Sequence, residues 1–286
     1  MDQGVYTMPE DQYHADPCDD PSLSASIAGI IWHRSPLHGW QAHPRLNPEA
    51  THRASSGFDT GTAAHALILE NDISKFCIIE ADDWRTKAAK EQRDQAREEG
   101  KTPILAKQLA DLTVMASAAQ AAVAQSEIAG IFQDGKPEQT ILAFDGIWIR
   151  GRLDWLTTDR KIILDYKTVS RSAAPESFLR SSVFNFGYDI QAAMYTLLNQ
   201  LTGGPEDAKF LWLVQETEPP FACSILGAAP SLIESGRRKL DHCMNLWGAC
   251  LDSGIWPGYG NRISWLEAPA WEIMKIEDRE MMEEEQ

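Results

Sequence analysis

The pattern of apolar and polar positions predicts a group of strands in the middle of the chain with helices on both sides of it. Residues 139–169 alternate as strands do, and within them a polar turn at 157–161 is followed by a short apolar run at 162–164. Further strands are predicted at 77–79, 210–214 and 222–226. Strands and helices in this arrangement predict an α/β (α+β) fold.

Helical periodicity marks the segments that surround these strands. The predicted helices cover residues 23–32, 60–69, 84–100, 106–129, 175–180, 187–202 and 230–252. The helix at 84–100 is charged and ends at Gly100, which is typical of an exposed helix, whereas the one at 106–129 is apolar enough to pack.

Three charged side chains flank the apolar run at 162–164. Asp165 and Lys167 follow it directly, and Asp154 precedes it across the polar turn. Because side chains alternate along a strand, Asp165 and Lys167 point to one face and Tyr166 to the other, and a hairpin brings Asp154 close to Asp165. Two carboxylates beside an ammonium can bind Mg²⁺ and stabilise a phosphorane, so the pattern indicates phosphodiester hydrolysis.

The other interpretation of the same residues is a solvated surface pair. Asp-x-Lys is a short pattern that occurs by chance in many chains. However, the apolar run that leads into it favours a buried strand, and buried charges need partners or a metal. The preceding Gly-Arg-Leu-Asp at 151–154, placed at hairpin distance, also favours a site.

The order of these motifs resembles the PD-(D/E)xK nuclease superfamily, in the branch with a downstream Gln-x-x-x-Tyr, here Gln191 and Tyr195. Within that branch the chain is similar to the RecE-type exonucleases (exonuclease VIII). The likeness covers nearly the whole chain and rests on segments that occur in the family's order: 22–26 with 35–36, the histidine helix 61–70, Glu138, 151–154, 165–167, 187–195, 214–216 and 254–259.

This resemblance implies a restriction-endonuclease-like core, a central mixed sheet flanked by helices, with an N-terminal helical elaboration. It also implies that Asp154 and Asp165 bind one or two Mg²⁺ ions, for which Mn²⁺ substitutes, with help from His65 and the backbone carbonyl of Tyr166. Lys167 would orient or deprotonate the attacking water and stabilise the pentacovalent phosphate.

Several further candidates have two interpretations. His65 alone, in an alanine-rich helix, is typical of a packed residue, and only the resemblance implies a metal ligand. Glu138 is either a further metal-binding carboxylate or a surface residue of a turn. Gln191 and Tyr195 lie one helical turn apart, so both would reach the scissile phosphate or the terminal nucleotide. Tyr188 would stack on a base or pack in the core. The candidate DNA-binding residues are Arg152, Arg171, Tyr188 and Gln191.

The net charge limits how DNA could bind. With 26 Lys and Arg against 42 Asp and Glu, the charge of −16 has the wrong sign for a simple nucleic-acid binder, so a local basic track is required. Candidate tracks lie in 85–97, at Arg150 and Arg152, at Arg171 and Arg180, and at 237–239. Part of the acidic excess lies in 1–20 and 277–286.

The cysteines and the apolar stretches indicate the cellular compartment of the protein. Five cysteines without Cys-x-x-Cys spacing are typical of cytosolic thiols, and they predict no iron–sulfur cluster. No apolar stretch approaches the roughly 20 residues of a membrane helix, and no signal-peptide pattern is found. We expect a cytoplasmic protein of a bacterial or phage-infected cell.

The resemblance implies a metal-dependent exonuclease that digests linear double-stranded DNA processively from 5′ to 3′. The 3′ single-stranded tails would serve a single-strand annealing recombinase in phage or prophage recombination, and the enzyme would be a ring-shaped homo-oligomer, a tetramer. Alternatives that the sequence leaves open are a restriction-like endonuclease and a non-catalytic protein that binds DNA ends or a partner. A helicase-coupled module is disfavoured because no P-loop pattern is found.

The expected domain organisation follows from these elements. Residues 1–20 are expected to be flexible, residues 21–272 to form a single nuclease domain, and residues 273–286 to be an acidic tail. Within the domain, the helical elaboration covers about 21–130 and the catalytic core about 131–272.

Overall fold

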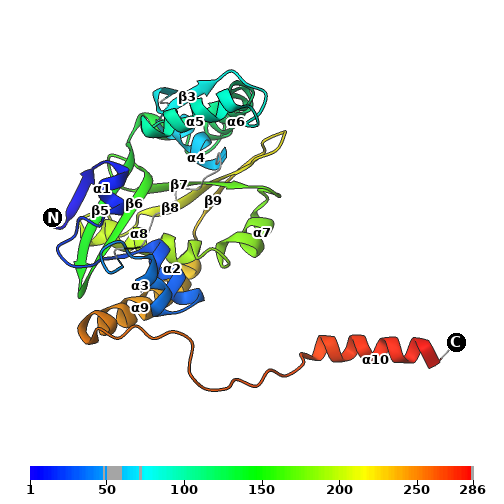
Figure 1. Cartoon of the computed structure of the whole chain (residues 1–286). Coiled ribbons are helices and arrows are strands. Elements are labelled where there is room, and N and C mark those ends of the chain that lie inside the picture. The colour runs from blue at the N-terminus through cyan, green and yellow to red at the C-terminus, as the bar shows by residue number, and fades with distance from the viewer. Residues whose placement is uncertain (48, 50–59, 71–72, 285–286) are drawn as a thin grey trace.

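A mixed β-sheet forms the centre of the protein in the computed structural model, which describes residues 1–47, 49, 60–70 and 73–284 (Figure 1). The strand order is β1-β5-β6-β7-β8-β9, and the short β2 pairs with β6. The strands are β1 (Gly4–Thr7), β2 (Leu23–Ser24), β5 (Lys136–Asp145), β6 (Ile147–Leu156), β7 (Ile162–Val169), β8 (Lys209–Glu216) and β9 (Cys223–Gly227). The expected central mixed sheet flanked by helices is confirmed.

The predicted hairpin lies between β6 and β7, with the polar turn at 157–161 as its loop. The two strands are antiparallel but pair only at Trp155 with Leu164 and at Leu156 with Ile163. They separate beyond this point, where Asp154 and Asp165 stand. β7 and β8 are parallel and are connected through the helix α8 (Tyr188–Leu201). The sheet therefore opens next to the predicted carboxylates.

The main hydrophobic core lies between one face of the sheet and the helices α2 (Ala25–His33), α8 and α9 (Pro230–Ser253). The helix α3 (Pro36–Ala42) packs against α2 and α9. Gly236 allows α9 to approach α8, because a Cβ there would clash with the backbone oxygen of Asp189. At Gly151 a Cβ would lie 2.8 Å from the ring of Tyr195, so this glycine lets α8 lie close against β6. Before α8 come α7 (Pro175–Phe178) and the π-helix η4 (Leu179–Val183).

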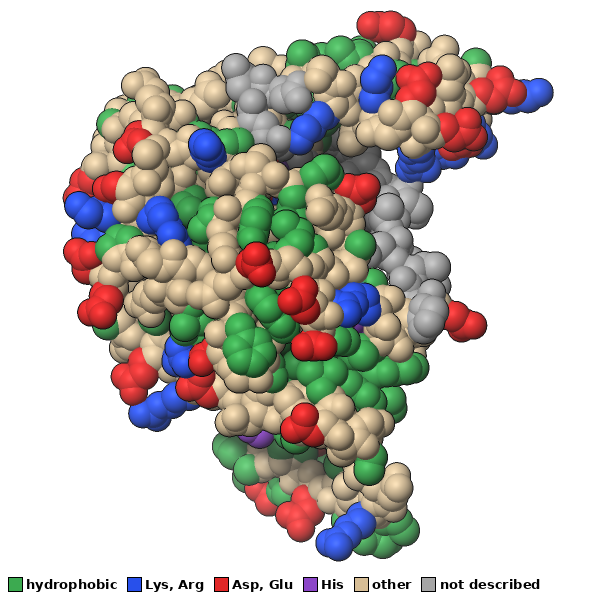
Figure 2. Space-filling model, turned by 90° about the vertical axis from the view of Figure 1, so that its left-hand side faces the viewer, with side chains coloured by type: hydrophobic (Ala, Val, Ile, Leu, Met, Phe, Trp, Pro, Cys, Tyr) green, Lys and Arg blue, Asp and Glu red, His purple; other side chains and the backbone are tan. Residues whose placement is uncertain are grey.

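A second lobe covers the opposite side of the sheet at β7 and β8 (Figure 1). It contains α4 (Thr60–His65), the π-helix η1 (Ala66–Glu70), the 3-10 helices η2 (Ile73–Lys75) and η3 (Ile131–Gln133), α5 (Lys87–Glu98), α6 (Ala106–Ala124), and the parallel strands β3 (Phe76–Ile79) and β4 (Thr102–Leu105). Its apolar residues pack against Leu164, Tyr166 and Leu213 of the sheet. Figure 2 shows this lobe overhanging the body with a hollow below it, on a surface where acidic and basic side chains are interspersed.

The N-terminal prediction is wrong. Residues 1–20 were expected to be flexible, but β1 pairs with β5 and is followed by α1 (Glu10–His14). Met8, Tyr13 and Cys18 are buried in a small cluster with Leu142 of β5. Residues 21–47 also differ from the expected elaboration, since α2 belongs to the main core and α3 packs against α2 and α9. Only the later part of the predicted elaboration forms the separate lobe.

The C-terminal part leaves the body after α9, which ends at Gly254 in a left-handed conformation with φ +69°. An exposed segment leads away to the helix α10 (Ala270–Glu284), so the expected acidic tail is helical over most of its length (Figure 1). Across residues 1–47, 60–70 and 73–284, no helix combines the length and the apolar character needed to cross a membrane.

Candidate active site

Two carboxylates face each other across β5 and β6. Pro137 pairs with Trp155 and Gln139 with Leu153, which places Glu138 opposite Asp154. Glu138 has φ +55°, a left-handed conformation that is uncommon for a residue with a side chain and that costs roughly 1–3 kcal/mol. Like charges directly opposite each other are destabilising. The strand pair therefore holds two acids in an arrangement that calls for a positive group between them.

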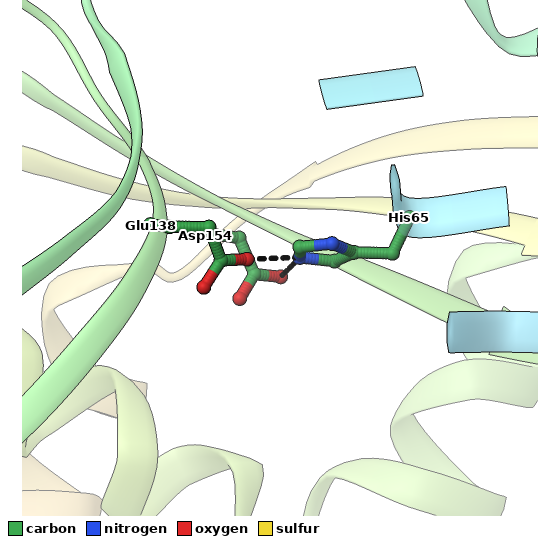
Figure 3. Close-up of side chains that lie close together, drawn as sticks. All are labelled: His65, Glu138 and Asp154. Carbon is green, nitrogen blue, oxygen red and sulfur yellow. Dashed lines mark ion pairs between the residues drawn. The ribbon is translucent and has the colours of Figure 1, made fainter. Parts of the chain in front are cut away.

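His65 supplies that group from the lobe. Its Nε2 lies 3.2 Å from Oε1 of Glu138 and 3.4 Å from Oδ2 of Asp154 (Figure 3). His65 is the last residue of α4, and the helix changes to the π form directly after it. Such π segments are frequent at functional sites. The three side chains are each about one-fifth exposed, so they are neither core residues nor fully solvated.

The charged groups of this triad shift one another's pKa. Burial alone would lower the pKa of His65, but the carboxylates of Asp154 and Glu138 outweigh it and raise that pKa to about 9. Burial alone would raise the pKa of Asp154, but His65 and the Lys167 charge hold it below its usual value. Burial raises the pKa of Glu138, with His65 acting in the opposite direction. The imidazole is therefore protonated at neutral pH without a metal.

Asp165 lies beside the triad but does not belong to it. Its side chain is fully buried, Oδ1 accepts a hydrogen bond from Nε2 of Gln191 at 2.9 Å, and Oδ2 is 2.5 Å from Nζ of Lys167. Burial raises the pKa of Asp165 to about 7 although Lys167 opposes the shift. Burial lowers the pKa of Lys167, but Asp165 and Asp154 outweigh it and raise that pKa, so Lys167 is a cation at neutral pH.

Tyr166 has the orientation that strand alternation predicts. Its ring lies in the apolar cluster between the lobe and the sheet, and its hydroxyl donates to Oε1 of Gln215 at 2.7 Å. Its backbone N–H donates to Oδ2 of Asp154 at 2.8 Å, so the Asp154 side chain takes the place of a strand partner where β6 and β7 separate. In a strand, the N–H and C=O of one residue point to the same side, so the Tyr166 carbonyl also faces Asp154.

A cavity of about 600 Å³ opens over these groups. Its walls come from both the lobe and the sheet and include His65, Glu138, Arg152, Asp154, Lys167 and Tyr188. The cavity is also lined by five residues that were not predicted as site residues, namely Glu10, Lys75, Phe76, Thr102 and Thr168. Nothing in the spacing along the chain connects these positions, because the fold brings them together from the N-terminal segment, the lobe and β7.

The remaining predicted site residues differ in whether they line the cavity. Arg152 pairs with Glu138 and donates to the backbone oxygen of Met8 at 2.9 Å, so its guanidinium is already engaged. Tyr195 is buried behind Gln191, against Phe210, and does not line the cavity. Arg171 is exposed and lies outside the cavity wall, so its DNA-binding role stays a prediction.

Most of the other candidate basic tracks are neutralised by neighbours. Arg150 is buried against Asp16, with NH1 3.2 Å from Oδ1. Other pairs between candidate basic residues and acids are Arg85–Asp83, Lys87–Glu91, Arg93–Asp94, Arg97–Asp94, Arg180–Glu176, Arg237–Asp145, Arg237–Asp241, Arg238–Glu234 and Lys239–Asp189. Within the described residues, these arginines and lysines do not form a continuous free track.

The donor set of the triad fits a divalent cation. One nitrogen of His65 and one carboxylate oxygen each of Glu138 and Asp154 lie within 4.8 Å of one another. Carboxylate oxygens suit hard ions such as Mg²⁺ and Mn²⁺, and imidazole suits the softer transition metals. Asp165, predicted as a ligand from the sequence, is instead held by Lys167 and Gln191 in this conformation.

Comparison with known proteins agrees with this fold. Residues 39–269 match the family described as a PDDEXK-like domain of unknown function (DUF3799), and the chain belongs to that family. A crystal structure from Eubacterium rectale, described as a "putative exonuclease", has a similar fold with a TM-score of 0.55 at 11% identity, covering 94% of this chain and 98% of that chain. A search of curated proteins finds no match. The chain is thus a PD-(D/E)xK domain, and its class supports a nuclease.

Proposed function

We propose that the protein is a metal-dependent DNA exonuclease that digests linear double-stranded DNA. The observation that carries the proposal is the convergence of His65, Glu138 and Asp154 at one cavity, with the Lys167 ammonium on the same wall. A histidine and two carboxylates without a catalytic lysine would equally suit a structural metal. The lysine adds the positive charge that phosphodiester cleavage requires.

His65, Glu138 and Asp154 would hold the ion, and the carbonyl of Tyr166 faces the same side. A divalent cation there would supply an activated water and neutralise charge on the phosphate. Lys167 stays protonated beside Asp165, so we assign it the stabilisation of the developing phosphorane charge and the orientation of the water, rather than proton abstraction. Asp165 holds the lysine in place, and Gln191 holds Asp165 by donating a hydrogen bond to its other oxygen.

The finer features of the proposal rest on the likeness to the RecE-type exonucleases. They are 5′-to-3′ polarity, processivity, 3′ tails passed to an annealing recombinase and a ring-shaped tetramer. A cytoplasmic location is proposed from the pattern of the cysteines. Exposed large apolar side chains around 263–266 and 271–282 are compatible with association between copies or with a partner.

Incubation with end-labelled linear duplex and with closed circular duplex tests the proposal. With Mg²⁺ or Mn²⁺ we expect the linear duplex to shorten from its ends and the circle to stay intact, with no cleavage in EDTA. Ca²⁺ should bind without supporting turnover, because it activates water poorly. Cleavage of the circle would favour the restriction-like endonuclease instead. Equal activity in EDTA would contradict the metal mechanism, and binding of ends without cleavage in any metal would favour the non-catalytic alternative.

A further inference from the structure

An exposed group of aromatic rings borders the cavity on the side of α8. Its members are Trp32 at the end of α2 and Phe184 and Phe186 just before α8, and we refer to these three as the aromatic strip. Phe186 is 64% exposed, and Trp32 and Phe184 are each 41% exposed. Rings of this size usually contribute to a core, so exposed rings that lie together indicate a binding surface.

The aromatic strip is continuous with the candidate active site. The ring centroid of Phe186 lies 5.6 Å from that of Tyr188, and Tyr188 lines the cavity. Nζ of Lys167 lies 4.9 Å from the centre of the Tyr188 ring. A chain of contacts therefore runs from the exposed surface through Tyr188 to the lysine at the site of chemistry.

Basic groups accompany the rings. Nζ of Lys239 lies 5.0 Å from the Phe184 ring and 5.5 Å from the Trp32 ring, and Asp189 holds it at 2.5 Å. The exposed His242 packs edge-on against Trp32 at 5.9 Å. Trp32 is followed directly by the exposed His33 and Arg34. Because Asp189 already pairs with Lys239, the exposed Arg34 supplies the positive charge next to the rings, and the grouping suits an anionic ligand that has flat faces.

The local backbone places the three rings of the aromatic strip next to one another. The segment before α8 buries Ser182 and Val183 at the end of η4, and Gly187 then turns with φ +70° into the helix. Gly187 lies close to α2, where a Cβ would be 3.6 Å from Cα of Gly29. This contact brings the loop that carries Phe184 and Phe186 next to the end of α2 that carries Trp32.

We propose that the aromatic strip binds single-stranded DNA by stacking of its bases, and guides one strand between the solvent and the cavity. The inference rests on the proposed function and names a substrate path for it. Base stacking on aromatic rings tolerates any sequence, as a non-specific exonuclease requires, and the exposed Arg34 close to Trp32 suits the phosphates. The alternative is that a second copy of this chain binds to the same rings, and the experiment distinguishes this from DNA binding.

Fluorescence anisotropy of a labelled oligothymidylate, measured in EDTA with the full chain, tests the aromatic strip directly. Phe186→Ala and Trp32→Ala should each weaken binding roughly tenfold, because each loses a stacking surface. Phe186→Trp keeps a ring and should bind at least as tightly as the wild type. Phe144→Ala is the matched control, since Phe144 is 52% exposed but lies on β5 and packs on Trp148; it should bind normally.

The outcomes separate the aromatic strip from the nuclease proposal. If the wild type cleaves linear DNA but the strip variants bind the oligonucleotide as the wild type does, the DNA-binding role of the aromatic strip is wrong and the proposed function stands. If no metal supports cleavage but the variants lose binding, the DNA-binding role of the aromatic strip is supported and the proposed function is wrong. If the variants change only the sedimentation coefficient, the surface is an interface between copies and the proposal is overturned. Unchanged melting temperatures exclude misfolding as the cause.

Discussion

Two clusters in this protein are built from the same kinds of residue, yet only one has the properties of a site. In the first, His65 lies between the carboxylates of Glu138 and Asp154. In the second, His43 lies 3.1 Å from Asp16, and Arg150 lies on the other side of that carboxylate. Both are attached to β6, through Asp154 and Arg150. They differ in exposure and in the balance of charge.

The buried cluster is complete in itself. His43 and Asp16 are at most 5% exposed, and Asp16 also accepts hydrogen bonds from the backbone and hydroxyl of Ser22. Nδ1 of His43 accepts backbone N–H groups of Arg45 and Leu46. Burial alone would raise the pKa of Asp16, but His43 and Arg150 lower it to about 2. One acid surrounded by several donors needs no further cation.

The cluster of His65 contains two acids instead of one. Both carboxylates share one imidazole at the wall of a cavity, Arg152 also pairs with Glu138, and the backbone at Glu138 is held in an unfavourable conformation. Two neighbouring carboxylates that open to solvent suit an exchangeable ion. The number of carboxylates and their exposure therefore separate the structural His43 from the candidate metal ligand His65, where residue type alone does not.

The largest expected effect is on cleavage by Asp154→Asn. The amide still accepts the N–H of Tyr166, but a charged ligand is lost, so the rate should fall by roughly a hundred- to a thousandfold while the fold is kept. Rates on end-labelled duplex measure this. Asp159→Asn changes a carboxylate in the turn of the same hairpin and should cleave normally. Equal rates for both variants would remove Asp154 from the site.

The next effect concerns stability rather than chemistry. Asp16→Ala leaves Arg150 and His43 buried without their acid, which should lower the free energy of unfolding by roughly 3–5 kcal/mol. Denaturant unfolding measures the change, and the exposed Asp11→Ala should change little. Activity per folded molecule should be unaltered. An Asp16→Ala protein as stable as the wild type would mean that this cluster does not support the fold.

The two histidines give the sharpest pair of variants. His65→Ala should weaken Mn²⁺ binding by roughly ten- to a hundredfold and change the melting temperature of the metal-free protein little. His43→Ala should lower the melting temperature with or without metal and leave the Mn²⁺ affinity of the folded protein unchanged. Calorimetric titration and thermal melting of both variants measure this. If His65→Ala loses stability but binds Mn²⁺ normally, His65 is a packed residue.

The smallest effect is on pH dependence. The pKa of His65 is raised to about 9, so its contribution to metal-free stability should be complete below about 6.5 and lost as pH rises to about 9. The pKa of Asp16 is lowered to about 2, so its contribution should be complete above about 4 and lost as pH falls to about 2. Melting curves of wild type, His65→Gln and Asp16→Asn test both windows. A wild-type alkaline limb that His65→Gln leaves unchanged would contradict the assignment.

Strand alternation and turn chemistry predicted the centre of the fold well. The hairpin of Asp154 and Asp165, the opposite orientation of Tyr166 and the helix that carries Gln191 follow from local pattern. β1 was missed because four residues in a polar segment give little signal, and their pairing with β5 depends on contacts more than a hundred residues apart. β4 was missed because a proline interrupts its short apolar run.

The site was harder to predict than the fold. His65 and Glu138 meet Asp154 only because the lobe packs over the sheet. From the sequence alone each of the two residues therefore had two interpretations, and the resemblance was needed to favour a metal ligand at His65. Asp165 was predicted as a ligand because it adjoins Lys167, but that adjacency lets the lysine and Gln191 occupy both of its oxygens. The buried pair of Asp16 and His43 has no local pattern, since the two residues are 27 positions apart in the sequence.

Titration of the metal-free protein with Mn²⁺ near pH 7.5 tests the central claim most directly. We predict saturable binding to the wild type, with release of protons because His65 must deprotonate to bind, and loss of this binding in Asp154→Asn but not in Asp159→Asn. Binding that is equally tight in all three proteins, or the absence of binding to the folded wild type, would contradict a metal centre at His65, Glu138 and Asp154.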